Sequence, residues 1–320
     1  MKIGMVSDSL AELPFEDMLD TAVELGVAGI ELNTGNWSTA PHVDLDRLLG
    51  SPEARRALLT AIESRGLELF ALNANGNQLD PTVGPRQSKV LRDTITLAAE
   101  LGVSTVVCMS GLPEGAEGDV TPNWITASWP PEVHETLRWQ WDERLLPYWR
   151  DLVAHTEAVG VQRLAIELHG NQLVFNVPTL LRLREEVGPL VGANLDPSHL
   201  LWMGGDPLAA IGHLGPAIHH VHAKDTMIDA GNVAIRTRLE NLPMDRVHER
   251  AWSYVTVGFG HDESWWRSFC YRLRLAGYDG WLSIEHEDLM ISRIEGVGRS
   301  IDVLRSAAPE NPPDYQTQDV

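Results

Sequence analysis

The sequence alternates short apolar runs with longer helix-forming segments, and most of the helix-forming segments end at a glycine. The segment 14–25 places Met18 and Ala22 on one face. It stops at Gly26, and the apolar run 29–33 follows. Eight such units occur in order, and eight parallel strands close a barrel, so the sequence predicts an α/β protein with a single (β/α)8 TIM barrel. The predicted strands are 3–7, 29–33, 67–74, 105–109, 164–168, 193–195, 218–222 and 281–284, and the predicted helices are 14–25, 51–65, 86–101, 143–159, 177–187, 207–214, 264–275 and 295–307.

An open, doubly wound sheet is the alternative arrangement of alternating strands and helices. Such a sheet binds its ligand at one switch point, whereas the ionisable strand ends are spread widely along this chain and no GxGxxG follows the first strand. A length of 320 residues fits one large α/β domain or two ordinary ones. Because no linker interrupts the pattern, we assign 1–308 to one barrel and 309–320 to a C-terminal tail.

Two long insertions lengthen the connections that follow predicted strands. The first, at about 111–140, is rich in Gly, Pro and Trp, and the second, at about 226–261, is mostly polar. Both follow strands at the C-terminal face of the barrel, where active sites form, so we expect each to make a lid or a wall of the substrate site. The tail 309–320 is predicted to be extended or disordered, or to dock on a neighbouring subunit of an oligomer.

The formal net charge of −20 limits the partners of the protein. A phosphate backbone requires a basic face, so this charge argues against a nucleic-acid partner. Cys108 and Cys270 lie far apart and form no CxxC, which favours a reducing compartment over a disulfide framework. The chain starts without a charged leader and long apolar region, and no run approaches about 18 apolar residues. We therefore expect a cytoplasmic protein without a membrane segment.

Ionisable residues gather where four of the predicted strands end. In a parallel α/β barrel the carboxyl ends of the strands meet at one face, where residues from different strands build the active site. The four segments therefore predict a shared cluster of carboxylates and imidazoles at that face. They are IELH at 166–169, NLDPSH at 194–199, HVHAKD at 220–225 and IEHED at 284–288.

Glu167 and Glu285 are expected to face each other across this cluster from the fifth and eighth strands. Two carboxylates that face a common point repel each other unless a cation or a shared proton lies between them. Taken singly, each would be expected to form an ordinary ion pair, but Asp196 and His222 complete a set of oxygen and nitrogen donors. This set suits Mn²⁺, Mg²⁺, Co²⁺ or Zn²⁺ better than a soft metal, and we predict one divalent ion, with Mn²⁺ as the first choice.

The spacing of the histidines does not identify the metal ligand by itself. Alternation along the seventh strand leaves His220, His222 and Lys224 on one side. We expect His219, His220 and His286 to point outward or to pack against other residues. The residues alone therefore leave the choice of His222 open.

Other polar residues at the strand ends are candidates for contact with substrate. His169 lies two residues beyond Glu167, which on a strand places both side chains on one side. It is a candidate ligand, general base or substrate-orienting residue, and as a base an imidazole works near neutral pH. His199 is better placed to meet substrate hydroxyl groups. Lys224 and Asp225 are predicted either to form a local ion pair or to contact substrate oxygens.

Two further features fit a carbohydrate ligand. Asn73, Asn75 and Asn77 surround Gly76 and could donate hydrogen bonds to a sugar, or simply form a turn. Tryptophans, Trp129 among them, concentrate in and after the first insertion, where they could stack on a sugar or an aglycone, or form a plug or an interface. We predict Asn77 and Trp129 as substrate contacts. The absence of GxxxxGK(S/T) and GxSxG motifs argues against nucleotide-dependent and serine-hydrolase functions.

At these residues the sequence resembles the xylose isomerase-like superfamily of TIM-barrel sugar isomerases and epimerases, over nearly its whole length. The resemblance rests jointly on NLDPSHL at 194–200, HVHAKD at 220–225 and SIEHED at 283–288. In that family a divalent metal is held by Glu, Asp, His and Glu from late strands. The resemblance therefore resolves the choice among the histidines and implies the metal ligands Glu167, Asp196, His222 and Glu285.

A narrower resemblance joins the Trp-rich stretch 122–149, the ExH of the fifth strand and GFGH at 258–261. These features are similar to the larger, catalytic alpha subunit of bacterial C-glycoside deglycosidases, which pairs with a small β-rich subunit. The resemblance implies such a partner, a 3-oxo-glycoside as substrate, and cleavage of the carbon–carbon bond to the aglycone. It also implies that His169 is the general base.

The sequence leaves two enzymatic interpretations open. In a lyase, His169 would remove the C2 proton and the enolate would expel the aglycone from C1. In a sugar or ketose isomerase or epimerase, Glu167 and Glu285 would exchange protons on opposite faces of an enediolate while His169 positions the substrate. In both, a divalent cation stabilises the developing charge. An abasic-site endonuclease is disfavoured by the acidic charge, and a non-catalytic sugar-binding protein would leave four convergent ligands unexplained.

Overall fold

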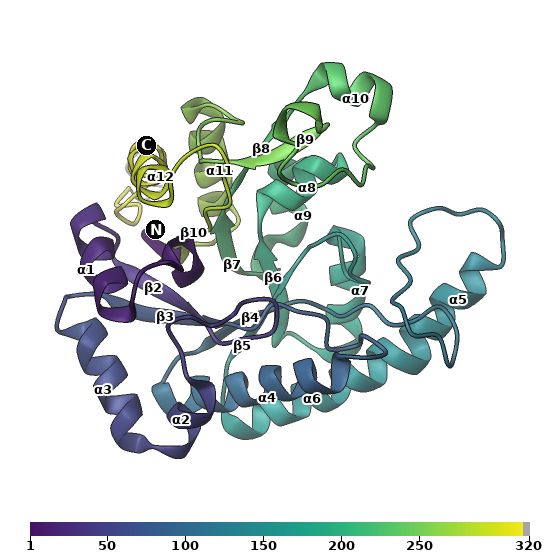
Figure 1. The fold of residues 1–320 in the computed structure, drawn as a ribbon, viewed down its shortest axis with the longest axis horizontal. Helices are drawn as coiled ribbons and strands as arrows, with labels where there is room; N and C mark the ends of the chain where they lie inside the picture. Colours follow the sequence, from purple (N-terminus) through teal and green to yellow (C-terminus); the bar gives the residue numbers. More distant parts are fainter. Residues whose placement is uncertain (316–320) are drawn as a thin grey trace.

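Eight parallel strands form a closed barrel in the computed structural model, which describes residues 1–315 (Figure 1). The strands follow the order β1-β10-β7-β6-β5-β4-β3-β2 around the barrel. The prediction of a (β/α)8 barrel is therefore confirmed. The barrel strands are β1 (Lys2–Val6), β2 (Gly29–Asn33), β3 (Glu68–Asn73), β4 (Thr105–Cys108), β5 (Arg163–Glu167), β6 (Val191–Leu195), β7 (Ile218–Ala223) and β10 (Trp281–Ile284).

Eight helices form the outer layer around the barrel; seven of them connect successive barrel strands, and the eighth, α12, follows the last strand (Figure 1). Their apolar faces cover the barrel, and the predicted helix positions agree with the structure to within a few residues. The largest difference is a short π-helical segment over 140–145 that precedes the sixth helix. The helices are α1 (Phe15–Leu25), α3 (Pro52–Glu63), α4 (Gly84–Leu101), α6 (Leu146–Val159), α7 (Val177–Val187), α9 (Pro207–Leu214), α11 (Glu263–Leu275) and α12 (Arg293–Ala307).

The glycine after α1 shows why glycine residues end the helices. Gly26 has φ 85° and ψ 31°, a left-handed conformation that residues with a Cβ rarely adopt. Its N–H donates a 3.0 Å hydrogen bond to the Ala22 carbonyl, which has no partner further along the helix. The chain then turns directly into β2.

The amino-terminal end of the barrel interior is filled by aromatic packing. Phe70 stacks on Trp281 with ring centroids 4.2 Å apart and on His220 at 5.8 Å. An added Cβ at Gly4 would lie 2.4 Å from the Phe70 ring, so this packing requires glycine there. Side chains close this end of the barrel. The ionisable residues lie at the opposite, C-terminal end of the strands, where TIM barrels form their active sites.

Both insertions contain secondary structure that the sequence did not indicate. The insertion 111–140 includes α5 (Val133–Trp139), and the insertion 226–261 contributes most of an antiparallel hairpin and one helix. In Figure 1, α5 lies at the right edge and α10 at the upper right. The additional elements are β8 (Asp225–Ile228), β9 (Trp252–Val255) and α10 (Ala230–Arg236), together with α2 (Leu45–Gly50) and α8 (Pro197–Met203) elsewhere in the chain.

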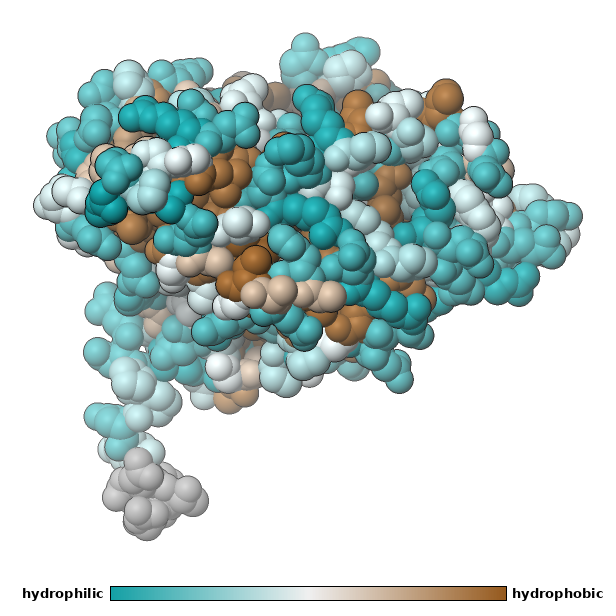
Figure 2. Space-filling view, turned by 90° about the horizontal axis from the view of Figure 1, so that it is seen from below, coloured by the Kyte–Doolittle hydropathy of each residue, from teal (hydrophilic) through white to brown (hydrophobic). Residues whose placement is uncertain are grey.

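The surface in Figure 2 is mostly hydrophilic, with hydrophobic side chains gathered in small patches. No helix within residues 1–315 is long and apolar enough to span a bilayer. The start of the predicted tail is anchored, because the Pro309 carbonyl accepts hydrogen bonds from the N-terminal amine at 2.9 Å and from Arg274 at 3.0 Å. The end of that tail, 316–320, lies outside the described residues, and its docking on another subunit stays a prediction.

Candidate metal and substrate site

Four adjacent strands bring the predicted metal ligands to one place. Glu167 is the last residue of β5, His222 lies near the end of β7, and Glu285 directly follows β10. Asp196 follows β6 and caps α8, since its Oδ1 accepts a 2.8 Å hydrogen bond from the Ser198 N–H. This cap holds the carboxylate with its other oxygen turned to the cluster.

The donor atoms of these four side chains all lie within 4.8 Å of one another. His222 Nδ1 is 3.2 Å from Glu167 Oε2 and 3.2 Å from Glu285 Oε2. His222 Nδ1 and Asp196 Oδ2 are buried and form no hydrogen bond among residues 1–315, although Lys224 Nζ lies 3.2 Å from Asp196 Oδ2 as an ion-pair neighbour. Buried polar atoms without partners are rare, and here they face a common point with two carboxylates. Three oxygen donors and one imidazole nitrogen therefore fit a divalent cation.

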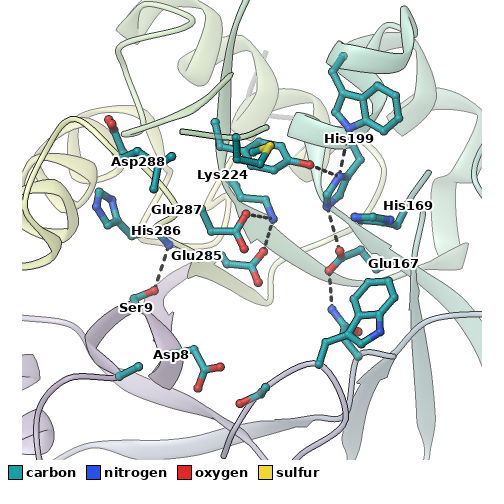
Figure 3. A pocket seen from close by; sticks show the side chains of 18 of the residues that line it. Asp8, Ser9, Glu167, His169, His199, Lys224, Glu285, His286, Glu287 and Asp288 are labelled. Carbon is teal, nitrogen blue, oxygen red and sulfur yellow. Dashed lines mark hydrogen bonds and ion pairs between the residues drawn. The ribbon is translucent and has the colours of Figure 1, made fainter. Parts of the chain in front are cut away.

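Lys224 lies beside the cluster and balances part of its negative charge (Figure 3). Its Nζ is 2.6 Å from Glu285 Oε2, 3.2 Å from Asp196 Oδ2 and 3.3 Å from Glu287 Oε2. Burial alone would lower the pKa of Lys224, but the surrounding carboxylates raise it well above its ordinary value. Lys224 is therefore charged, and it pairs across the cavity instead of with Asp225.

The carboxylates of the cluster have different affinities for protons. Burial opposes the charge of Glu167, but His199 and His222 hold its pKa well below its ordinary value. Burial raises the pKa of Asp196 to about 7; Lys224 opposes this shift, while Glu167 and Glu285 add to it. Such crowding of carboxylates is the arrangement that a cation relieves.

Glu31, in the middle of β2, is a central residue that the sequence did not reveal. It is fully buried and accepts hydrogen bonds from Asn73 Nδ2 at 2.8 Å, Ser283 Oγ at 2.8 Å, His220 Nε2 at 2.8 Å and His222 Nε2 at 3.1 Å. Burial opposes its charge, yet His222 and His220 hold its pKa well below the ordinary value. The one available signal was a carboxylate inside an otherwise apolar strand.

The contact with Glu31 determines how His222 presents its ring. Because the carboxylate accepts a hydrogen bond from Nε2, that nitrogen keeps its proton and Nδ1 is directed to the cluster. His220 also points into the barrel and not outward, since both histidines bind the same carboxylate. Glu31 therefore orients His222 for the ligand role that was predicted for it. His220 binds the same carboxylate but is not part of the cluster of four candidate ligands.

His169 lies at the side of the cluster with one ring nitrogen free. Its Nδ1–H donates a hydrogen bond to the Gly170 carbonyl, so Nε2 is the unprotonated nitrogen of the neutral ring. Burial lowers the pKa of His169, although Glu167 acts in the opposite direction. The side chain lines the cavity beside His199, with ring centroids 4.2 Å apart. His169 therefore has the position and protonation state of a base.

His199 was predicted to contact substrate hydroxyl groups, but in the structure both of its ring nitrogens already contact protein groups. Its Nε2 lies 2.9 Å from Glu167 Oε1, and its Nδ1 lies 3.0 Å from the Tyr254 hydroxyl and 3.4 Å from Trp202 Nε1. Burial lowers the pKa of His199 to about 3, so the ring is neutral. It lines the cavity, but its contacts mainly hold Glu167 in place.

Three residues predicted to contact substrate bind other protein groups or lie outside the cavity lining, and their contact with substrate stays a prediction. Asp225 Oδ2 accepts hydrogen bonds from the backbone of the GFGH segment, at 3.1 Å from Gly258 and 2.9 Å from His261. Asn77 forms two hydrogen bonds with the backbone of Leu112, at 2.7 and 2.9 Å, and therefore joins the loop after β3 to the loop after β4. Trp129 is 78% exposed and does not line the cavity.

A cavity of about 1480 Å³ opens above the cluster. Its polar floor is formed by Glu167 and Glu285 of the cluster and by Asn33 and Asn75, and Asn75 Nδ2 donates a 2.9 Å hydrogen bond to Glu167. Both insertions contribute to its walls, as predicted. The aromatic wall consists of Trp37, Trp124, Trp202, Trp252 and Tyr254, and the apolar wall consists of Leu239, Met244, Leu289, Ile291 and Ile294.

Comparisons with known proteins place this site in a wider group. The family model described as "Xylose isomerase-like TIM barrel" matches residues 19–307. The chain is 48% identical over 308 residues to the uncharacterized protein YfiH of Bacillus subtilis strain 168, covering 95% of this chain and 98% of YfiH.

Two solved structures show the same fold. 3-keto-D-glucoside 4-epimerase (YcjR) from E. coli has a TM-score of 0.63 at 15% identity, covering 96% of this chain and 99% of YcjR. An L-ribulose 3-epimerase has a TM-score of 0.62 at 17% identity, covering 97% of this chain and 99% of the other.

Proposed function

The chain belongs to the xylose isomerase-like TIM barrel family, and on that premise we propose that it is a divalent-metal-dependent enzyme that cleaves 3-oxo-C-glycosides. The reaction begins with removal of the C2 proton next to the sugar carbonyl and ends with release of the aglycone from C1. The observation that supports this most is the neutral His169, whose Nδ1 donates to the Gly170 carbonyl and leaves Nε2 as the unprotonated nitrogen, beside a cluster of metal-ligand type.

Each group of the cluster has a task in this reaction. Glu167, Asp196, His222 and Glu285 would hold a divalent cation, for which Mn²⁺ is a suitable choice. Such a cation, when bound, would supply stabilisation of the negative charge that develops on the carbonyl oxygen. His169 Nε2 accepts the proton, and Asn33 and Asn75 offer amide groups to sugar hydroxyls at the floor of the cavity.

The charges around the cluster favour His169 over the carboxylates as the base. Lys224 Nζ lies 2.6 Å from Glu285 Oε2. Burial raises the pKa of Glu285, but Lys224 and His222 outweigh it and lower the pKa to about 2. Glu167 accepts hydrogen bonds from Asn75 at 2.9 Å and Asn194 at 3.1 Å. A carboxylate stabilised in its charged form is a weak base, whereas a neutral imidazole is effective near neutral pH.

The size of the cavity supports a substrate larger than a free monosaccharide. Ligand pockets typically measure about 300–1,000 Å³, and this cavity is larger, at about 1480 Å³. Its polar floor suits a sugar ring. The apolar wall between the insertion 226–261 and α12 suits a hydrophobic aglycone attached to that ring.

A metal-dependent sugar isomerase or epimerase is the second candidate. Glu167 and Glu285 reach one cluster from β5 and β10, as two carboxylates that exchange protons with opposite faces of an enediolate would. One protein of the same fold is named a 3-keto-D-glucoside epimerase. In this mechanism His169 would only orient the substrate.

Proton exchange followed by NMR distinguishes the two candidates. The Mn²⁺-loaded protein, with any small β-rich subunit that copurifies, is incubated in D₂O with a 3-oxo-C-glucoside and separately with a panel of free ketoses. Deuterium at C2 together with aglycone release is the expected result. Exchange on a ketose while the C-glucoside stays intact would instead establish the isomerase or epimerase.

The variant His169→Ala tests the base directly. It should retain Mn²⁺, because His169 is not one of the four ligands, and it should lose C2 exchange by a factor of about 10²–10⁴. Metal content after dialysis is the control for an intact site. Exchange close to that of the wild type would remove His169 from the role of base.

A further inference from the structure

We propose that Asp8 is the acid that protonates the leaving aglycone, on the side of the cavity opposite His169. This inference rests on the proposed C-glycoside cleavage. It adds a group that the cleavage requires and that neither the cluster nor His169 supplies.

The closed order of the strands places Asp8 across the cavity from the base. Asp8 follows β1, and His169 follows β5. Three strands separate β1 from β5 in either direction around the barrel, so the two strands are diametrically opposite. Figure 3 shows Asp8 on one side of the cavity, with Glu167 and His169 on the other.

The Asp8 carboxylate is free to act on a ligand. It lines the cavity, and its Oδ1 is buried with no hydrogen-bond partner in the described part of the chain. Burial raises the pKa of Asp8, and the charge of Glu285 adds to this, while Ser38, His42 and Arg293 oppose it. A carboxyl that retains its proton more readily than an exposed one is suited to donate it.

Asp8 lies beside the apolar wall that suits the aglycone. Arg293 Nη1 donates a 2.8 Å hydrogen bond to the Asp8 carbonyl and so fixes the segment after β1 to the start of α12. Leu289 and Ile291, which precede α12, and Ile294, in its first turn, line the same cavity. An aglycone against these residues places its bond to C1 between His169 on one side and Asp8 on the other.

The proton balance of the cleavage shows why an acid is needed. His169 takes the C2 proton, and the electrons of that bond form the enolate. When the carbonyl re-forms, a C1–C2 double bond forms and the bond from C1 to the aglycone breaks, with its electron pair leaving on the aglycone carbon. That carbon takes the proton of Asp8, so the products are an unsaturated 3-oxo sugar and a protonated aglycone. Exchange with water then returns a proton to Asp8 and removes one from His169.

The variant Asp8→Asn separates the two proton transfers. With a 3-oxo-C-aryl glucoside in D₂O, it should keep C2 exchange within about threefold of the wild type, while aglycone release falls by about 10²–10⁴. The loss should be smaller for an aryl group that stabilises the departing electron pair better. Asp17→Asn, which changes an exposed carboxylate of α1 outside the cavity lining, is the matched control.

The outcomes of this experiment are distinct. Unchanged aglycone release in Asp8→Asn, or a parallel loss of exchange and release with normal metal content and unfolding temperature, overturns the role of Asp8 alone. A wild type that exchanges and releases nothing overturns the proposed cleavage, and the inference falls with it. Retained exchange with lost release, restored in part by the better leaving group, is the expected result.

Discussion

The variant Glu31→Gln tests whether a residue outside the ligand set controls metal binding. The Glu31 carboxylate accepts hydrogen bonds from four side chains, two of them the imidazoles of His220 and His222. A glutamine of the same shape has one acceptor oxygen and one NH₂ donor, so its NH₂ must face one or more of the groups that now donate to Glu31. If the NH₂ faces His222, Nε2 of the ring has to accept a hydrogen bond. The proton of the ring then moves to Nδ1, which faces the metal cluster.

We expect Glu31→Gln to lower both the affinity for Mn²⁺ and the free energy of unfolding, and typical values for such contacts give the size of each effect. Changing the partner of a metal-ligating histidine typically lowers metal affinity by a factor of about 10–100. Removing one partner of a buried ion pair costs about 3–5 kcal/mol of folding free energy. The unfolding entropy of a 320-residue chain is about 0.7 kcal/mol/K, so the metal-free variant should unfold about 4–8 °C lower than the wild type.

Calorimetric titration of Mn²⁺ into the metal-stripped protein at pH 7 measures the first effect, and thermal unfolding in a chelator measures the second. Glu114→Gln is the matched control, since Glu114 is also a buried carboxylate, lies 3.2 Å from Arg144 and is outside the cavity lining. Wild-type Mn²⁺ affinity in Glu31→Gln, with only the unfolding temperature lowered, would refute the argument that Glu31 orients His222.

Two further predictions concern the ligand set and the pH dependence of stability. Glu285→Ala should lose Mn²⁺ on dialysis while Glu287→Ala retains it, and full occupancy and activity in Glu285→Ala would remove Glu285 from the ligands. Burial, with Arg184 and Arg163, lowers the pKa of His219 from 6.5 to about 4. The unfolded chain therefore binds a proton that the folded chain lacks between these values, and His219 lowers stability as pH falls, by at most about 1.4 kcal/mol per pH unit. His219→Gln should flatten this slope in denaturant titrations from pH 4 to 6.5, and an unchanged slope would contradict the assignment.

The fold could be predicted because its signals are local. The end of α1 at Gly26 can be predicted from the helix that precedes it, and a strand such as β2 can be predicted from its own apolar residues. The hairpin of β8 and β9 could not be predicted in this way, because its strands are 23 residues apart and are polar in part. The pairing of β8 with β9 depends on contacts between segments that are distant in the sequence, and no short turn motif joins the two strands.

The candidate site was predictable in part for the same reason. Glu167 and Asp196 end apolar strands, so their direction follows from the barrel. Asp225 and Asn77 have the same signature, but their partners are backbone groups of distant loops, and no spacing indicates those. Glu31 was missed because its importance comes from four donors on other strands.

The distribution of the site around the barrel explains how one arrangement can serve different substrates. The four candidate ligands come from β5, β6, β7 and β10, which are neighbours in the closed order. The other half of the rim, β1 to β4, supplies Asp8, Asn33, Trp37 and Asn75 to the cavity. A change at Asp8 or Trp37 can therefore alter what is bound while the four ligands stay in place, whereas Asn75 also holds Glu167 through a 2.9 Å hydrogen bond. Because the two halves face each other, a substrate bound at the ligands lies between His169 of the ligand half and Asp8 of the other half, so the proposed base and the proposed acid act on it from opposite sides.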